Sequence, residues 1–242
     1  MNKILLLLSA IVIVTSAFRI TEPTSRKVHR IKQIYSYKGK DTTTYVYNAD
    51  GRIAHIKNTN GDKTDYEYLD SIIIKRYYDS FRKLDFADTM VLNKNGLVAK
   101  VTSNNFSSIE IREYNADNYL VKNTVSDTAG KKIYYGEYQY LNGNEISSTT
   151  TGFSGDLGSN AKYQYYLDQP NTIGVDNMGS DFVGNSSNNP RSSFSNKVVG
   201  MEAYTRNYNY HYDKDGRIII KATYDNDTIH PKLIDSIYYS YY

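Results

Sequence analysis

The chain has 242 residues, with 29 Lys and Arg against 26 Asp and Glu, and a formal charge of +3 gives no electrostatic reason to expect a nucleic-acid partner. It contains no Cys, which excludes disulfides, thiolate nucleophiles and Cys-ligated metal centres. Tyr is the dominant aromatic residue, with 26 copies, whereas Trp is absent.

Residues 1–17 have the features of a signal peptide. Lys3 precedes an apolar run from Ile4 to Val14, and small residues up to Ala17 complete a cleavage site. The run is too short to cross a bilayer as a helix, which takes about 20 apolar residues. We therefore expect a secreted or periplasmic protein with no transmembrane segment after signal removal, and without a lipobox Cys for a lipid anchor. A buried N-terminal helix is the alternative interpretation of this segment.

A phrase built from Tyr, Asn or Asp, and Gly recurs along the rest of the chain. Segment 45–53 reads YVYNADGRI and segment 210–218 reads YHYDKDGRI, with weaker copies at 92–98, 114–120 and 138–144. Asp-Gly or Asn-Gly between strand-forming runs is a strong hairpin signal, because Gly adopts the left-handed backbone that such turns require. The copies repeat about every 22 residues, and further turn signals fall between them. This spacing predicts strands of about six or seven residues joined by tight turns.

Tyrosines two residues apart mark the predicted strands. Successive side chains of a strand point to opposite faces, so each pair projects from one face, while intervening residues such as Glu67 and His211 face water. Because aliphatic residues are sparse outside the apolar N-terminus, we expect Tyr to be the main hydrophobic residue of the core. The pairs are Tyr45 and Tyr47, Tyr66 and Tyr68, Tyr138 and Tyr140, Tyr210 and Tyr212, and Tyr239 and Tyr241.

Residues 152–200 interrupt this pattern. They are rich in Gly, Ser and Asn, and the Tyr alternation stops after Tyr166. So long an irregular stretch within a compact domain is typical of a functional insertion, which we expect to lie across an edge or mouth of the sheet. The fold prediction is one all-β domain over 18–242, a curved antiparallel meander of about ten strands that forms an open sheet or half-barrel.

The Tyr-x-Tyr-(Asn/Asp)-x-Asp-Gly-Arg-Ile units resemble the YD repeats of Rhs proteins, which are β-hairpin arrays of large bacterial surface and toxin-delivery proteins. The chain is still more similar to an uncharacterised secreted bacterial family built from a few such hairpins, a domain of unknown function. In that family a Gly-x-Ser-x-Asn-x-Pro-like segment precedes the last repeat, and Gly184 to Pro190 matches it here. The resemblance implies a β-sheet protein of the cell envelope and assigns no catalytic residue. The chain is too short for the closed shell of Rhs proteins, and it lacks the lipobox of its secreted relatives.

Metal and catalytic motifs are weak in this sequence. Asp213, Asp215, Asp225 and Asp227 offer oxygen ligands for calcium, but Asp-x-Asp-Gly is also ordinary turn chemistry, which we favour. The four His residues show no zinc-site spacing. No Gly-x-Ser-x-Gly motif occurs, and the candidate carboxylates lie at strand positions that solvent exposure explains. We therefore predict no metal, no cofactor and no catalytic residue.

Two functions remain as expectations. The first is an exported, non-catalytic interaction module of the cell envelope that binds an unknown protein, glycan or lipid. The second is a periplasmic carrier that holds an amphipathic lipid or glycan in a Tyr-lined concavity. A cavity lined by Tyr45, Tyr68, Tyr140 and Tyr210 would favour the carrier. The candidate ligand-binding residues are Tyr45, Tyr47, Tyr66, Tyr68, Tyr138, Tyr140, Tyr210 and Tyr212.

Overall fold

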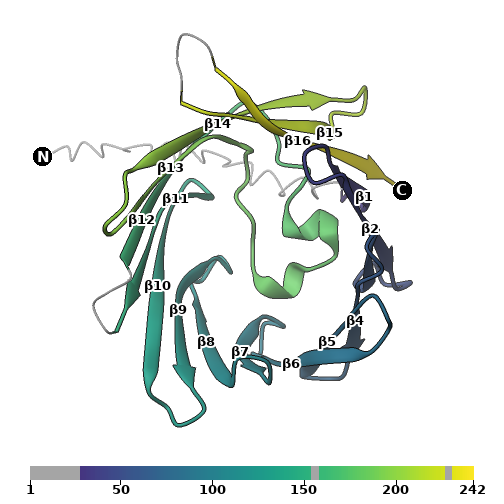
Figure 1. The fold of residues 1–242 in the computed structure, drawn as a ribbon, viewed down its shortest axis with the longest axis vertical. Coiled ribbons are helices and arrows are strands. Elements are labelled where there is room, and N and C mark those ends of the chain that lie inside the picture. The colour runs from purple at the N-terminus through teal and green to yellow at the C-terminus, as the bar shows by residue number, and fades with distance from the viewer. Residues whose placement is uncertain (1–27, 154–157, 227–230) are drawn as a thin grey trace, which may run out of the picture.

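The chain folds into a closed β-barrel in which each strand pairs with its sequence neighbours. The computed structural model describes residues 28–153, 158–226 and 231–242. Within them sixteen antiparallel strands form one ring, and β16 closes it by pairing with β1 (Figure 1). The first eight strands are β1 Ile31–Ser36, β2 Asp41–Tyr47, β3 Ile53–Asn58, β4 Lys63–Tyr68, β5 Ile72–Tyr78, β6 Leu84–Leu92, β7 Val98–Ser103 and β8 Ser108–Tyr114. The second eight are β9 Leu120–Asp127, β10 Lys132–Leu141, β11 Asn144–Gly152, β12 Gly158–Tyr165, β13 Arg191–Val198, β14 Tyr204–Tyr212, β15 Ile218–Tyr224 and β16 Leu233–Tyr241.

The barrel has two rims that differ in their connections. Because the strands alternate in direction, every connection that follows an even-numbered strand lies at one end and every connection that follows an odd-numbered strand lies at the other. The connection from β12 to β13, residues 166–190, turns into the barrel and carries two short 3₁₀ helices, η1 Val175–Met178 and η2 Asp181–Val183 (Figure 1). We call this segment the plug, its end of the barrel the plug rim, and the opposite end the distal rim.

The turn phrase produces the same local structure at several places on the plug rim. In segment 48–52 the amide of Asn48 donates to the carbonyl of Arg52, and the amide of Gly51 donates to the carbonyl of Asn48. The same two bonds recur in segments 93–97, 115–119 and 213–217. The fourth residue has a positive φ each time, and Asn118 takes that conformation at 63° where Gly is missing. Each of these turns is followed by a register shift, a bulge that inserts one extra residue.

The bulge determines which side chains face the interior. Val46 pairs with His55 on the outside, whereas after the register shift Tyr47 pairs with Ile53 on the inside. The inward residue that opens the next strand is then buried, as Ile53, Val98 and Ile218 are at 0–1% exposure. A core cluster therefore lies inside the barrel, where wall residues pack around Phe182 of η2.

Polar side chains occupy many outward positions of the wall, among apolar ones such as Ile74, Val91 and Ile111. Glu67 and Arg76 form an ion pair of 2.6 Å across β4 and β5, and Lys63 and Asp65 form one of 2.8 Å along β4. Cross-strand hydrogen bonds continue the pattern around the barrel, joining Gln33 to Thr44, Gln139 to Ser147, and Gln164 to Ser193. In the described residues no helix has the length and apolar character needed to span a membrane.

Two parts of the fold prediction are wrong. The sheet is a closed barrel of sixteen strands, not an open sheet or half-barrel of about ten. Segment 152–200 was predicted as an irregular insertion, but it contains β12 and β13, and residues 166–190 are the long connection between them. Asn, Lys, Gln and Ser fill the outward positions of these two strands, which hides them from a search for apolar alternation. The predicted signal peptide, 1–17, lies outside the described residues.

Candidate functional site

Tyrosines at the plug rim bond to the adjacent strand. In five even-numbered strands the last residue is a Tyr whose hydroxyl donates to a carbonyl at the start of the preceding strand. Because the ring lies inside the barrel, the Tyr hydroxyl needs a hydrogen-bond acceptor there, and this carbonyl provides it. The bonds run from Tyr47 to Ile31 at 2.5 Å, Tyr68 to Ile53 at 2.8 Å, Tyr114 to Val98 at 3.0 Å, Tyr165 to Glu145 at 2.6 Å and Tyr241 to Ile218 at 2.7 Å.

The same end of the barrel holds the plug. The Tyr212 hydroxyl donates to Oε1 of Gln169 at 2.7 Å, and the Tyr114 hydroxyl reaches the carbonyl of Val183 at 3.3 Å. The Phe182 ring lies 6.2 Å from the rings of both Tyr66 and Tyr68. The plug is therefore packed and hydrogen-bonded to both sides of the barrel wall.

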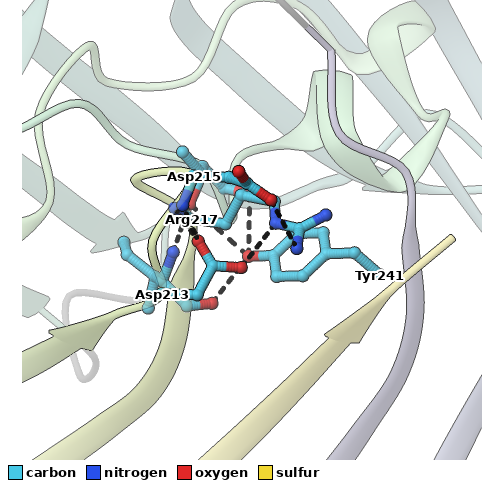
Figure 2. Close-up of polar contacts among 6 residues, drawn as sticks. Asp213, Asp215, Arg217 and Tyr241 are labelled. Atoms are coloured by element: carbon cyan, nitrogen blue, oxygen red, sulfur yellow. Dashed lines mark hydrogen bonds and ion pairs between the residues drawn. The ribbon is translucent and has the colours of Figure 1, made fainter.

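The turn between β14 and β15 shows what the acidic residues of the phrase do. One carboxylate oxygen of Asp213 accepts the amides of Asp215 and Arg217, and the other accepts Nε of Arg217 at 2.6 Å. The Arg217 guanidinium also pairs with Asp215 at 3.2 Å and lies 5.1 Å from the centre of the Tyr241 ring (Figure 2). Although partial burial opposes the shift, these hydrogen bonds lower the pKa of Asp213.

This geometry does not support the calcium alternative. Asp213 and Asp215 lie at the plug rim, whereas Asp225 follows β15 at the distal rim, a strand of seven residues away. Asp227 lies outside the described residues. Across the part of the chain that the structure describes, no group of three or more His, Asp or Glu side chains is arranged to hold a metal ion.

The eight predicted ligand-binding tyrosines all point into the barrel, but they do not share one cavity. Tyr45, Tyr47, Tyr66 and Tyr68 pack against the core cluster around Phe182. The Tyr138 hydroxyl donates to Oδ1 of Asn123 at 3.2 Å. Tyr212 bonds to the plug, as described above, and burial raises its pKa to about 12. Most of these rings therefore serve the core, and their ligand-binding role stays a prediction.

Tyr140 and Tyr210 line an inner cavity of about 320 Å³ between the plug and the wall from β10 to β15. Its charged lining consists of Glu145 and Arg191, which are paired at 3.1 Å, and Lys221. Tyr68 lines a separate cavity beside Phe182, and Tyr45 lines neither of the two. The shared cavity that would favour a carrier built on Tyr45, Tyr68, Tyr140 and Tyr210 is thus not formed.

A second chamber, of about 380 Å³, lies inside the wall from β5 to β10 and extends to Phe106 on the β7–β8 connection at the distal rim. We call it the distal chamber. Its apolar surface comes from buried Met90, Val101 and Val125 and from the stacked rings of Tyr77 and Phe86, whose centres are 3.9 Å apart. Aromatic and aliphatic walls with a few polar groups are typical of small-molecule sites.

The charges of the distal chamber are unequally paired. Arg112 and Glu110 form two hydrogen bonds, of 2.9 and 3.0 Å, and Asp88 accepts the Tyr77 hydroxyl at 3.0 Å. Lys75 forms no ion pair with the described carboxylates, and its ammonium instead lies 4.5 Å from the centre of the Tyr77 ring. Burial lowers the pKa of Lys75, and Arg112 acts in the same direction against the opposing effect of Asp88. Among the described residues, the chamber therefore contains one cation that faces Asp88 but forms no ion pair.

Sequence reasoning missed the residues of the distal chamber. Lys75, Tyr77 and Asp88 fall within or at the end of segment 71–88, which contains no Gly and does not match the repeated phrase. An inward Lys between two outward positions gives no pattern that differs from an ordinary solvent-exposed Lys. Only the pairing of β5 with β6, which places Lys75 opposite Asp88, shows that both face the interior.

Comparisons with known proteins agree with the barrel. No protein-family model matches the chain, and no curated protein matches it. Among solved structures, a porin-like protein from Bacteroides uniformis has a TM-score of 0.64 at 16% identity, covering 88% of this chain and 98% of that one. A porin-like protein from Bacteroides vulgatus has a TM-score of 0.62 at 14% identity, covering 88% and 99%. The TcdB2-TccC3 structure has a TM-score of only 0.37 at 12% identity, which is too low to indicate a shared fold. The first two are similar to this chain in fold.

Proposed function

We propose that this chain is an exported, non-catalytic binding barrel of the bacterial cell envelope, and that its distal chamber holds an amphipathic ligand with an anionic head. The observation that supports the proposal best is Lys75, a half-buried cation that forms no ion pair with the described carboxylates, above an apolar surface and beside two stacked rings. A ligand carboxylate, phosphate or sulfate would pair with the ammonium, and its apolar part would cover Met90, Val101 and Val125.

The outer wall supports a barrel that stands in water. The two similar structures are described as porin-like, and a barrel wall that faces lipid carries a continuous apolar band with aromatic girdles. Here ion pairs such as Glu67 with Arg76 and Lys63 with Asp65 occupy outward positions of adjacent strands. Removing such charges from water without compensation would be costly, so this wall is suited to an aqueous compartment of the envelope.

The arrangement of acids and bases supports a binding role more than a catalytic one. Glu110 in the chamber is engaged by Arg112, and Glu145 in the inner cavity is engaged by Arg191. His55 and His211 face outward, and neither contacts the chamber. A general acid or base needs a titrating group beside the ligand, and neither of these two histidines lines the chamber.

The proposal is tested by calorimetric titration of the protein with dodecanoate, and with dodecyltrimethylammonium as the probe of equal chain length and opposite charge. We expect dodecanoate to bind, and the Lys75→Met substitution to weaken its binding by about tenfold or more, because a charge-assisted contact is lost. Lys100→Met is the matched control, since Lys100 is an exposed outward residue of the neighbouring wall. It should leave the affinity unchanged.

The stability of Lys75→Met separates lost binding from lost structure. Below the folded-state pKa of Lys75, both the folded and the unfolded chain carry the charge, so the cost of burying the charge is fully present. This cost disappears above pH 10.5, the ordinary pKa of a Lys, because the side chain is then neutral in both states. Lys75→Met should therefore be more stable than the parent protein to urea at pH 7, by an amount that falls as the pH rises towards 10.5. Equal affinity of the two amphiphiles, or of Lys75→Met and the parent, would contradict the proposal.

A further inference from the structure

The distal rim carries a ring of exposed hydrophobic side chains. Seven of its eight connections place a large apolar residue in the turn or within two residues of it, counting only the described residues. The exception is the β3–β4 turn, Thr59 to Asp62. The most exposed members are Phe81 at 89%, Phe106 at 75%, Met201 at 69%, Val199 at 65% and Tyr37 at 62%, and the others are Leu84, Ile133, Phe153, Tyr204 and Leu233.

The distribution is what makes these side chains notable, because single exposed apolar residues are common on any surface. Consecutive connections at one rim of a meander barrel are spatial neighbours, so the described members of the ring surround the distal mouth, with a gap at β3–β4. The plug rim also exposes apolar residues, namely Val28, Leu69, Val91, Leu141, Leu167 and Tyr242, but no Phe or Met among the described residues.

Charge separates the two rims further. Counted from the sequence, the connections at the plug rim contain four Lys or Arg against eight Asp, whereas those at the distal rim contain six of each sign. At the distal rim several cations stand beside the apolar residues, as Lys38 follows Tyr37, Arg82 follows Phe81 and Lys232 precedes Leu233, whereas Glu202 follows Met201. Aromatic residues with adjacent Lys or Arg suit the interface of a bilayer, where rings enter the headgroup layer and cations meet lipid phosphates.

We propose that the distal rim docks the barrel, axis upright, on an anionic lipid surface. The ring of apolar side chains enters the headgroup layer, the neighbouring Lys and Arg contact lipid phosphates, and the acidic plug rim is held away by repulsion. The polar outer wall limits how deep the barrel can enter, so it lies on the membrane and does not cross it.

The test is co-sedimentation of the purified protein with vesicles of phosphatidylcholine alone and of phosphatidylcholine mixed with phosphatidylglycerol. We expect binding to the mixed vesicles that weakens as salt is added. The triple variant Phe81→Ser, Val199→Ser, Met201→Ser should bind at least about tenfold more weakly, which corresponds to about 1.4 kcal/mol. All three residues are exposed and none lines the distal chamber, so folding and ligand binding should persist.

The matched control is the triple variant Leu69→Ser, Leu141→Ser, Leu167→Ser at the plug rim, which should bind vesicles like the parent protein. All the variants share the same N-terminus, so its apolar segment contributes equally to each. Equal loss in both triple variants, or no binding to mixed vesicles, would overturn the inference. The inference would also be overturned if the protein self-associates and Phe81→Ser disrupts the oligomer, because the rim would then be a protein interface. Lys75→Met should keep full vesicle binding, so failure of the ligand proposal is seen separately.

Discussion

The tyrosines that end β2, β4, β8, β12 and β16 contribute both a ring and a hydroxyl to the barrel. The rings fill the space between wall and plug, and the hydroxyls bond to the neighbouring strand, which satisfies backbone carbonyls at the rim. A Leu at these positions would fill the space without making the bond. Tyr is therefore better suited to these positions than an aliphatic residue that would only pack there.

Removing one such hydroxyl tests its contribution. Tyr68→Phe keeps the ring beside Phe182 and loses the 2.8 Å bond to the carbonyl of Ile53, so we expect stability to fall by about 1 kcal/mol. The measurement is the free energy of unfolding in urea. Tyr238→Phe is the control, because that hydroxyl faces outward and bonds to none of the described residues. A cost no larger than the control's would show that the hydroxyl adds nothing.

At the scale of elements, the turns and the plug depend on glycine for different reasons. Gly216 has a φ of +74° with open space around the position of a Cβ, so only its backbone conformation favours Gly. Gly179, at the end of η1, has a φ of +66°, and a Cβ there would lie 2.7 Å from the carbonyl oxygen of Gly51. The plug therefore approaches the β2–β3 turn closely at a residue without a side chain.

This difference predicts unequal effects of the same substitution. Gly216→Ala should cost about 1 kcal/mol, the penalty of a left-handed backbone for a residue with a Cβ. Gly179→Ala should cost about 3 kcal/mol, because it adds a clash with the β2–β3 turn and disturbs the 3.1 Å bond from the Ile53 amide to the Gly179 carbonyl. Urea unfolding of both variants measures the difference. Equal losses of unfolding free energy in the two variants would mean that the plug shifts to accommodate the added methyl group and that its contact with the wall does not stabilise the barrel.

At the scale of the whole molecule, closure joins the two ends of the described chain. Ile34 of β1 pairs with Tyr239 of β16, so a contact between residues some two hundred positions apart removes both edges of the sheet. Closing this loop is entropically costly and becomes favourable only when the rest of the barrel is in place. The seam is therefore the pairing on which the barrel as a whole depends.

Deleting residues 233–242 should leave β1 and β15 with exposed edges. We expect aggregation in size-exclusion chromatography and not a smaller monomeric barrel, since long unpaired edges associate with other chains. The full chain at the same concentration is the reference. A soluble monomer with an unchanged β-sheet circular dichroism spectrum would show that the seam is dispensable.

Local chemistry was predictable from the sequence, and much of the candidate site was not. The left-handed turn at Gly51 and the common face of Tyr66 and Tyr68 follow from residues within one hairpin, because turn geometry and strand alternation are short-range. The strands β12 and β13 escaped prediction because their outward residues are polar and their inward ones vary. Lys75 could not be singled out, because its lack of an ion pair depends on side chains from other strands.

What the sequence by itself determined is the series of hairpins: where the chain reverses, and which side chains share a face. Only the tertiary structure decided that this face is the inside of a ring, that the ring closes between β1 and β16, and that residues 166–190 fill one of its ends. The physical reason is range. A turn is decided by a few neighbouring dihedral angles, whereas closure depends on the accumulated twist and stagger of sixteen strands, which no single segment encodes.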